Sequence, residues 1–321
     1  MLISVVAPMH NEAGSIGEYI TQTMTTLQKN YDEFELVIID DGSTDNSVAI
    51  VKEMMEKYPS IHLIVLSRNF GHENALSAGL ANARGDYVVL MDSDLQNPPQ
   101  LIPELLNKLN EGFDVVYAAR KARHGESWLK KFSSNLFYWL AKKMTGFELS
   151  ADAADFRIFR RNVVDALNRL KENNRKLIML YAFVGFSTAS VPYEVPPRFA
   201  GKSKYNYFKL VKTALDAILS FSTRPLWIMS ILSIILSVLS AGYAGFILLQ
   251  HLIINNLIDG VASILCFTAG MFSILFLFLA LLSEYIGRIM TETKERPLYY
   301  IKQKFCSEDI NQDAKDSNPS K

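Results

Sequence analysis

The stretch from Asp86 to Gln96, DYVVLMDSDLQ, decides the fold. Tyr87 to Met91 is a short apolar run rich in β-branched residues, and it is bounded by a glycine before and two prolines after, which is typical of a buried strand in a parallel sheet. The run stops at two carboxylates, Asp92 and Asp94, which an extended backbone would direct to the same side. Because open α/β sheets bind ligands at the carboxyl ends of their strands, these acids mark a candidate site.

These acids suit a hard divalent cation. Mg²⁺ takes oxygen ligands and usually sits between one or two carboxylates and the phosphates of a substrate. Asp92, Asp94 and the carbonyl of Gln96 therefore predict a site for Mg²⁺ and a diphosphate. The alternative is that both acids only cap a turn before the helix that follows Pro98.

Composition indicates one large domain and a membrane part. The chain has 321 residues, of which 49% are hydrophobic, and this is more apolar than a soluble surface needs. Lysine plus arginine and aspartate plus glutamate are each 33, so the overall charge gives no indication of nucleic-acid binding. The two cysteines, Cys266 in an apolar span and Cys306 in the polar tail, exclude a disulfide framework and fit a cytosolic soluble part.

The amino-terminal half alternates short apolar runs with helical patterns. This alternation predicts a parallel, doubly wound α/β sheet with right-handed crossovers. The first run lacks a basic flank and a cleavage site, so it reads as a strand and not as a signal peptide, and no G-x-G-x-x-G follows it, which argues against an NAD enzyme. Strands are predicted at Ile3–Ala7, Phe34–Ile39, Ile61–Leu66, Tyr87–Met91 and Val115–Ala118, with helices starting near Glu12, Thr44, His72 and Pro99.

Polar groups follow each of the first four strands. They form the stretches Pro8–Glu12, Asp40–Ser43 and Ser67–His72, in addition to the acids after the fourth strand. In a parallel sheet these stretches would line one crevice. Asp41 and Ser43 have an alternative role, which is to build the turn and cap the helix from Thr44.

Two apolar spans predict a membrane anchor. No lysine or arginine occurs between Arg224 and Arg288, and the spans Leu226–Gln250 and Val261–Ser283 each exceed the length that crosses a bilayer. The polar break from Asn255 to Gly260 makes them a helical hairpin, the alternative being two buried core helices. Basic residues flank both ends, so the positive-inside rule places the amino-terminal domain and the tail in the cytoplasm. Residues 205–223 have the pattern of an interfacial helix.

Six motifs carry a resemblance to a known family. The strings PMHNE, IIDDGSTDNS, LSRNFGHENALSAGLANARGD, MDSDLQNPP, ADFRIF and RFAGKSKYN resemble, in order, those of the polyprenyl-phosphate glycosyltransferases of glycosyltransferase family 2, which include dolichyl-phosphate mannose synthases and bactoprenol glucosyltransferases. The resemblance favours the metal interpretation of Asp92 and Asp94 over the turn. His10 stands where the family more often has tyrosine, and Ala154 where it has glycine.

The resemblance implies a domain organisation and a set of site residues. It implies a Rossmann-like GT-A domain over residues 1–204. The patterns described above add the interfacial helix 205–223, two transmembrane helices within 224–287 and a cytoplasmic tail 288–321, whose polar end from Ser307 is predicted to be disordered. It assigns catalysis to Asp94, Asp155 and Arg157, and nucleotide-sugar binding to Pro8, Asn11, Glu12, Asp40, Asp41, Arg68, Gly71 and Asp92. The Mg²⁺ or Mn²⁺ site stays the one predicted above from Asp92, Asp94 and Gln96, and the positive charges of Arg123, Arg198, Lys202 and Lys204 suit an acceptor phosphate.

Some of these roles have alternatives. The basic residues could be solvated surface charges or contacts to anionic lipid. Asp155 is the family's candidate general base, but a phosphate monoester has its second pKa at about 6, so the acceptor is already largely ionised at neutral pH. We therefore favour Asp155 as a group that orients Arg157 or the acceptor, or that takes the proton from the minority of acceptor phosphates that are still protonated, and a structural Asp–Arg pair stays open.

The implied reaction is the inverting transfer of one sugar from a nucleotide-diphosphate sugar, such as UDP-glucose, to a polyprenyl phosphate of the undecaprenyl type. The enzyme would be a multi-pass plasma-membrane protein whose product serves cell-envelope polymers, with a homo-oligomer, a flippase and a downstream membrane glycosyltransferase as candidate partners. A processive polysaccharide synthase is the alternative, but its Q-x-x-R-W motif does not occur. The third interpretation is an inactive membrane-anchored scaffold.

Overall fold

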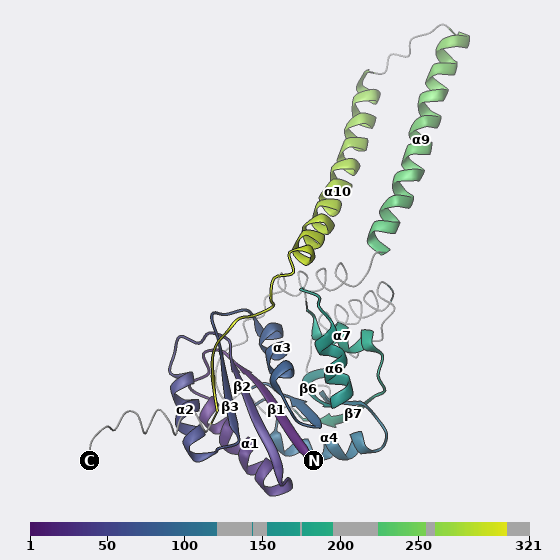
Figure 1. Cartoon of the computed structure of the whole chain (residues 1–321). Coiled ribbons are helices and arrows are strands. Elements are labelled where there is room, and N and C mark those ends of the chain that lie inside the picture. Colours follow the sequence, from purple (N-terminus) through teal and green to yellow (C-terminus); the bar gives the residue numbers. More distant parts are fainter. Residues whose placement is uncertain (121–142, 144–152, 174, 195–223, 255–260, 307–321) are drawn as a thin grey trace, which may run out of the picture. The chain divides into compact units, whose positions relative to one another are not determined.

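The computed structural model describes residues 1–120, 143, 153–173, 175–194, 224–254 and 261–306 (Figure 1). The chain divides into two compact units, one containing the sheet and its helices and the other containing helices α9 and α10. The elements of the first unit are β1 (Leu2–Met9), α1 (Ile16–Asn30), β2 (Glu33–Asp40), α2 (Ser47–Lys57), β3 (Ile61–Leu66), α3 (His72–Asn82), β4 (Tyr87–Leu90), the 3₁₀ turn η1 (Pro99–Leu101), α4 (Ile102–Asn110), β5 (Val115–Arg120), β6 (Ala153–Arg160), α6 (Arg161–Arg169), α7 (Leu177–Val184), β7 (Thr188–Tyr193) and β8 (Ile301–Phe305).

The eight strands form one sheet in the order β7-β5-β6-β4-β1-β2-β3-β8. Strands β1 to β4 are mutually parallel, as the sequence predicts. The prediction of a wholly parallel sheet is wrong, because β6 is antiparallel to both β4 and β5, and β8 is antiparallel to β3. The chain leaves β5 at Arg120 on the carboxyl edge and re-enters β6 at Ala153 on that same edge, so β6 must run back across the sheet.

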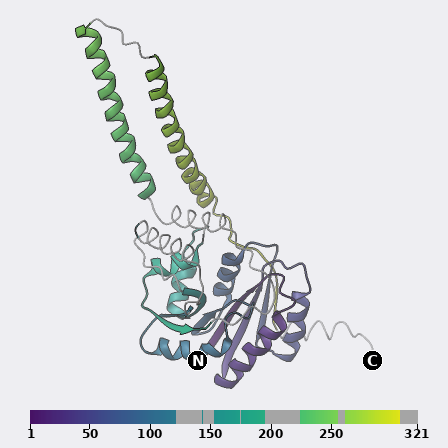
Figure 2. The ribbon, with the colours of Figure 1, turned by 180° about the vertical axis from the view of Figure 1, so that it is seen from behind.

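Helices cover both faces of the sheet (Figures 1 and 2). Alternate residues of a strand face opposite sides, and Ile3, Val5 and Ala7 of β1 belong to the buried apolar cluster that includes residues of α1, α2 and α4. The other face packs on α3, where a Cβ at Gly79 would lie 2.1 Å from Cγ1 of Val6. The absence of a side chain at Gly79 therefore lets α3 approach the sheet closely.

A polar cluster ties the strands together at their amino-terminal ends, away from the candidate site. Glu35 is buried, and its Oε1 accepts hydrogen bonds from Ser4 Oγ (2.6 Å) and Arg84 N (2.7 Å), while its Oε2 accepts one from Arg84 Nε (2.9 Å). Burial alone would raise the pKa of Glu35, but these hydrogen bonds and the Arg84 charge hold the pKa below its usual value.

Glu35→Gln is expected to lower the free energy of unfolding by about 1.5–3 kcal/mol, because hydrogen bonds to a charged group contribute that much. A lowered folded-state pKa means that the contribution is present above the ordinary pKa of 4.5 and is lost as the pH falls through the folded-state value. Denaturant titration between pH 7 and pH 3 measures both effects. Glu33→Gln is the control, since Glu33 pairs with the amino terminus at an exposed position and is expected to change stability little; equal losses in both variants would contradict the assignment.

Two long apolar helices, α9 (Arg224–Ile254) and α10 (Val261–Thr293), form most of the described part of the second unit. Within the described residues, one stretch, Gly270–Thr293, is long and apolar enough to cross a membrane, and Leu226–Leu236 is a shorter apolar helix. Many of their large apolar side chains are exposed, among them Trp227, Phe276 and Leu277. The predicted interfacial helix 205–223, the polar break 255–260 and the tail 307–321 lie outside the described residues.

Candidate active site

The carboxyl ends of β1, β2, β3 and β4 lie at one edge of the sheet, because these strands are parallel and adjacent. They end at Met9, Asp40, Leu66 and Leu90. The four polar stretches predicted to share one crevice therefore follow neighbouring strands at the same edge. Their position at one edge is confirmed, and the shared crevice stays a prediction.

The acids after β4 lie on a tightly constrained turn. Ser93 is buried and its Oγ donates a hydrogen bond to the carbonyl of Pro8 (2.8 Å), which ties the turn to β1. Gln96 N donates to Asp94 Oδ1 (3.0 Å), and Leu95 between them has a left-handed φ of 63°. Such a conformation costs a non-glycine residue about 1–3 kcal/mol and is often found at functional sites. Asp92 and Asp94 are both partly exposed.

His72 joins this acidic turn, a contact that sequence reasoning missed. As predicted, His72 is the first residue of α3, but its Nε2 also lies 3.5 Å from Asp92 Oδ1. The positive end of the α3 dipole favours a carboxylate there. The β3–α3 connection and the turn after β4 are thus in contact through side chains.

The donor set of the turn fits a cation that is shared with a substrate. Within the described residues, no group of three or more His, Cys, Asp or Glu side chains is arranged to hold an ion. Asp92 and Asp94 supply hard carboxylate oxygens without further protein acids, which is the arrangement in which Mg²⁺ or Mn²⁺ takes its remaining ligands from phosphates and water.

Asp40 and Asp41 are buried and are bonded to backbone N–H groups. Both oxygens of Asp40 accept from Ser43 N (3.1 and 3.3 Å), so Asp40 holds the turn after β2. Asp41 Oδ1 accepts from Phe70 N (2.7 Å) and its Oδ2 from Gly71 N (2.9 Å), so Asp41 fixes the loop after β3. Burial raises the pKa of Asp41 against the effect of these two hydrogen bonds. The predicted turn role applies to Asp40 more directly than to Asp41.

Two glycines allow the loops after β2 and β3 to approach each other. Gly42 has a φ of 69°, and a Cβ there would lie 2.6 Å from the backbone of Arg68 and Asn69. Gly71, with a φ of 96°, has open space where its Cβ would be, as expected for a position where a ligand can approach the backbone. Arg68 is exposed, and its guanidinium lies 4.2 Å from the ring centroid of Phe70.

His10 connects three of the site loops. Its Nδ1 donates to the carbonyl of Asp41 (2.9 Å), and its Nε2 accepts from the side-chain amides of Asn69 (3.1 Å) and Asn11 (3.3 Å). This pattern fits a neutral imidazole with its proton on Nδ1. Asn11, at a left-handed φ of 56°, also accepts from Thr44 N through Oδ1 (2.8 Å).

The remaining predicted nucleotide-site residues of the first polar stretch are Pro8 and Glu12. Pro8 is the second-last residue of β1 and accepts from Ser93, as described above. Glu12 is partly buried, and its Oε2 accepts from Ser15 Oγ (2.8 Å) just before α1. Glu12 thus helps to begin α1 at the same edge of the sheet.

Strand β6 brings the motif ADFRIF beside the acidic turn. Arg157 pairs with Leu90, the last residue of β4, so Asp155, two residues earlier in β6, lies beyond the end of β4 on the side of the sheet where the acidic turn begins. Arg157 is buried, and its guanidinium lies 4.6 Å from the ring centroid of Tyr181 and 5.5 Å from that of Tyr117. The predicted acceptor-phosphate residues Arg123, Arg198, Lys202 and Lys204 lie outside the described residues.

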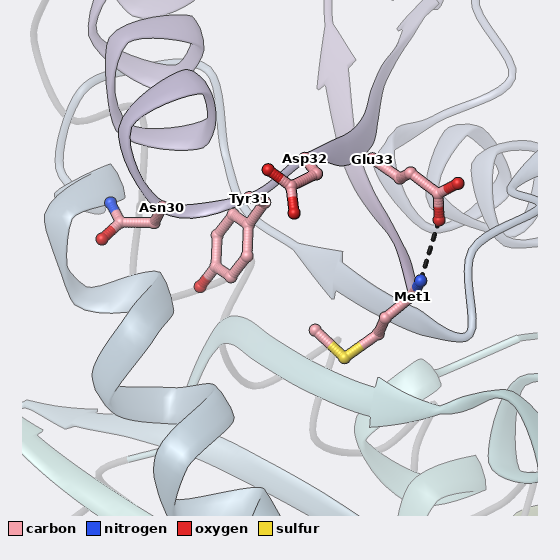
Figure 3. Close-up of a pocket in the computed structure, with 5 residues that line it drawn as sticks. All are labelled: Met1, Asn30, Tyr31, Asp32 and Glu33. Carbon is pink, nitrogen blue, oxygen red and sulfur yellow. Dashed lines mark hydrogen bonds and ion pairs between the residues drawn. The ribbon is translucent and has the colours of Figure 1, made fainter.

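A separate surface hollow lies at the other end of the strands (Figure 3). It is lined by Met1, Asn30, Tyr31, Asp32 and Glu33, and the amino group of Met1 pairs with Glu33 Oε2 at 2.8 Å. No residue of the acidic turn or of the neighbouring loops lines this hollow. It is therefore not part of the candidate site.

Comparison with known proteins identifies the family. Residues 4–167 match the glycosyl transferase family 2 domain, and the chain belongs to that family. It is 38% identical over 299 residues to an uncharacterized glycosyltransferase of Synechocystis sp., covering 93% of this chain and 94% of that protein. It is 36% identical over 310 residues to the undecaprenyl-phosphate 4-deoxy-4-formamido-L-arabinose transferase of Shewanella sediminis, covering 93% and 91%.

A solved structure shares the fold. The glucosyl-3-phosphoglycerate synthase from Mycobacterium tuberculosis, crystallised with Mn²⁺, uridine-diphosphate and phosphoglyceric acid, aligns with a TM-score of 0.51 at 22% identity, covering 68% of this chain and 76% of that one. The protein described here is thus a glycosyltransferase with a GT-A, Rossmann-like α/β domain built on a mixed sheet.

Proposed function

We propose that the enzyme transfers one sugar, with inversion, from a nucleotide-diphosphate sugar such as UDP-glucose to a membrane polyprenyl phosphate of the undecaprenyl type. The observation that carries the proposal is the position of β6, with Asp155 and Arg157, directly beside the strand that leads into Asp92 and Asp94. A donor diphosphate at the acids and an acceptor phosphate at the arginine would then meet at one sheet edge. The relative from Shewanella sediminis, which carries an undecaprenyl-phosphate transferase name, supports the acceptor class.

The donor would bind along the carboxyl ends of β1 to β4. Asp92, Asp94 and the Gln96 carbonyl would hold Mg²⁺ or Mn²⁺, and Pro8, Asn11, Glu12, Asp40, Asp41, Arg68 and Gly71 would surround the nucleotide. A bound divalent cation supplies positive charge that offsets the charge developing on the diphosphate leaving group. Because Asp40 and Asp41 already accept backbone hydrogen bonds, their main contribution is to shape the loops that meet the nucleotide.

The acceptor phosphate would be drawn to the arginine beside the acidic turn and to the basic residues Arg123, Arg198, Lys202 and Lys204. The planar guanidinium of arginine can donate two parallel hydrogen bonds to phosphate oxygens, and lysine contributes a compact positive charge. Since the phosphate is largely ionised at neutral pH, Asp155 orients Arg157 or the acceptor and is not required to remove a proton.

The apolar helices would anchor the enzyme in the plasma membrane as a two-helix hairpin, with the catalytic domain and the carboxyl terminus in the cytoplasm. This topology gives the site access to cytosolic nucleotide sugars and to the phosphate end of a lipid acceptor. The lipid-linked sugar would then pass to a flippase and a downstream membrane glycosyltransferase for cell-envelope polymers, and the enzyme itself would act as a homo-oligomer.

Cysteine labelling tests the topology. In a variant without Cys266 and Cys306, a cysteine at Asn256 is expected to react only from the external face, and one at Ser317 only from the cytosolic face, because the basic residues flank the hairpin on a single side. Permeabilised cells, in which both positions should react, are the control. The reverse pattern would refute the orientation and the use of cytosolic donors.

Solvent extraction of radiolabelled sugar tests the reaction. With undecaprenyl phosphate and a panel of nucleotide sugars, one donor is expected to yield an organic-soluble, lipid-linked monosaccharide. Label recovered as polymer would identify a processive synthase, and no transfer from any donor would identify an inactive scaffold. The panel also determines the sugar, because discrimination among hydroxyl groups depends on the shape of the pocket.

A further inference from the structure

The chain returns to the catalytic sheet after α10. Strand β8 is antiparallel to β3 at the edge of the sheet, with Phe305 opposite Leu63 and Ile301 opposite Leu66. Two side chains of β8 contact helices. Lys304 Nζ donates a hydrogen bond to Asn82 Oδ1 of α3 (2.8 Å), and the ring centroid of Phe305 lies 3.8 Å from Lys52 Nζ of α2. Sequence reasoning assigned no strand to this part of the tail.

The residue before β8 contacts the loop after β3. Tyr300 accepts a hydrogen bond from Ser67 N through its carbonyl (2.9 Å), and its ring centroid lies 6.3 Å from that of Phe70. The Arg68 guanidinium covers the Phe70 ring, so three side chains contact one another in series. The Tyr300 side chain is otherwise largely open to solvent, with 57% of the residue exposed.

The same loop is held on its other side by Asp41, which accepts from Phe70 N and Gly71 N. The stretch from Arg68 to Gly71 is therefore fixed between a buried carboxylate of the β2 end and a tyrosine that comes from the far end of the sequence. Because this loop carries Arg68 and Gly71, the position of the loop determines the shape of the donor pocket under the function proposed above.

We propose that β8 is a positioning element of the donor site, and that Tyr300 acts on the nucleotide sugar through the Arg68–Gly71 loop. The inference rests on the proposed function for its ligand, and it adds a residue outside the family 2 domain to the donor site. If β8 served only to cover the edge strand β3, its contacts with Asn82 of α3 and Lys52 of α2 would be enough to hold it there. The contact of Tyr300 with Phe70 is not needed for that purpose.

Hydrogen exchange and donor binding on the full-length protein in detergent test this proposal. In Tyr300→Ala, the amides of Phe70 and Gly71 are expected to exchange faster than in the wild type without any ligand. The Kd for UDP-glucose is expected to rise about 2- to 10-fold, the range that loss of one aromatic contact gives, while the KM for the acceptor and kcat stay unchanged. Tyr300→Phe keeps the ring and the backbone and is expected to behave as the wild type.

Lys304→Ala is the matched control, because it removes a contact of β8 that does not touch the loop. It is expected to leave Phe70 and Gly71 exchange and the Kd unchanged. Unchanged loop exchange in Tyr300→Ala, an unchanged Kd despite faster exchange, or equal effects in Lys304→Ala would each overturn the proposal. If the wild type binds no UDP-sugar but the exchange result holds, the bracing of the loop is supported and the proposed donor class is refuted.

Discussion

Asp94→Asn is expected to reduce sugar transfer by roughly two to three orders of magnitude, the loss that follows removal of one preorganised group that stabilises developing charge. The neutral amide cannot balance a divalent cation between the protein and a diphosphate. The amide oxygen of the introduced side chain can still accept the hydrogen bond from Gln96 N, so the turn with its left-handed Leu95 should persist. Asp94→Ala removes that hydrogen bond as well and is expected to be at least as inactive.

Direct metal binding provides the second measurement. Titration with Mn²⁺ in the presence of UDP, followed by electron paramagnetic resonance, should show a bound signal in the wild type and little in Asp94→Asn. Asp114→Asn is the control. Asp114 immediately precedes β5, at the end of the strands away from the acidic turn, and it accepts a hydrogen bond from Ser187. Full activity after treatment with EDTA would show that the assignment of the acids to a metal is wrong.

Asp155→Asn is expected to lose most activity at acidic pH and to recover part of it above neutral pH. Asp155 is expected mainly to orient the acceptor or to take the proton from the minority of acceptor phosphates that are protonated. In either case the deficit should shrink as the pH rises past the phosphate pKa of about 6, because the dianion then needs no base. Single-turnover rates across the pH range give this profile. A deficit that stays constant from roughly pH 6 to roughly pH 9 would exclude a role tied to the protonated acceptor.

Arg157→Lys is the companion variant. It keeps the positive charge between the Tyr117 and Tyr181 rings but loses the planar fork. The KM for the acceptor is expected to rise about tenfold, which corresponds to the loss of one charge-assisted hydrogen bond, with little change in the KM for the donor. A change confined to the donor KM would remove Arg157 from the acceptor site. Loss of the folded state would instead support a purely structural Asp–Arg pair.

The four parallel strands could be predicted from sequence because each is a short apolar run that is buried on both faces. Strand β6 could not, since its pattern is interrupted by Asp155 and Arg157, although Phe156, Ile158 and Phe159 are fully buried. Strand β8 could not either, because IKQKF has only apolar ends and lies at a sheet edge, where a single-sequence pattern is weakest. Antiparallel pairing of both strands depends on where the chain re-enters the sheet, which local pattern does not encode.

The candidate site, too, could be predicted from the sequence only in part. The motifs predict which residues follow the strands, and parallel pairing brings those residues to one edge. Contacts between loops are not encoded in spacing: the approach of His72 to Asp92 and the hydrogen bonds from Phe70 and Gly71 to Asp41 depend on how neighbouring crossovers pack. The signal that could have indicated Asp41 as a loop anchor is the pair of glycines, Gly42 and Gly71, which permit close backbone approach.

The pairing of β8 with β3 also has a consequence for synthesis of the chain. The two strands are about 240 residues apart in sequence, and ribosomes add about 5–20 residues per second. Synthesis of β8 therefore follows synthesis of β3 by roughly 10–50 s. During that interval the nascent sheet has an edge with unsatisfied backbone groups, which is a template for aggregation. Synthesis of the apolar helices comes before β8 emerges. This edge of the sheet can therefore close only after both apolar helices have been synthesised.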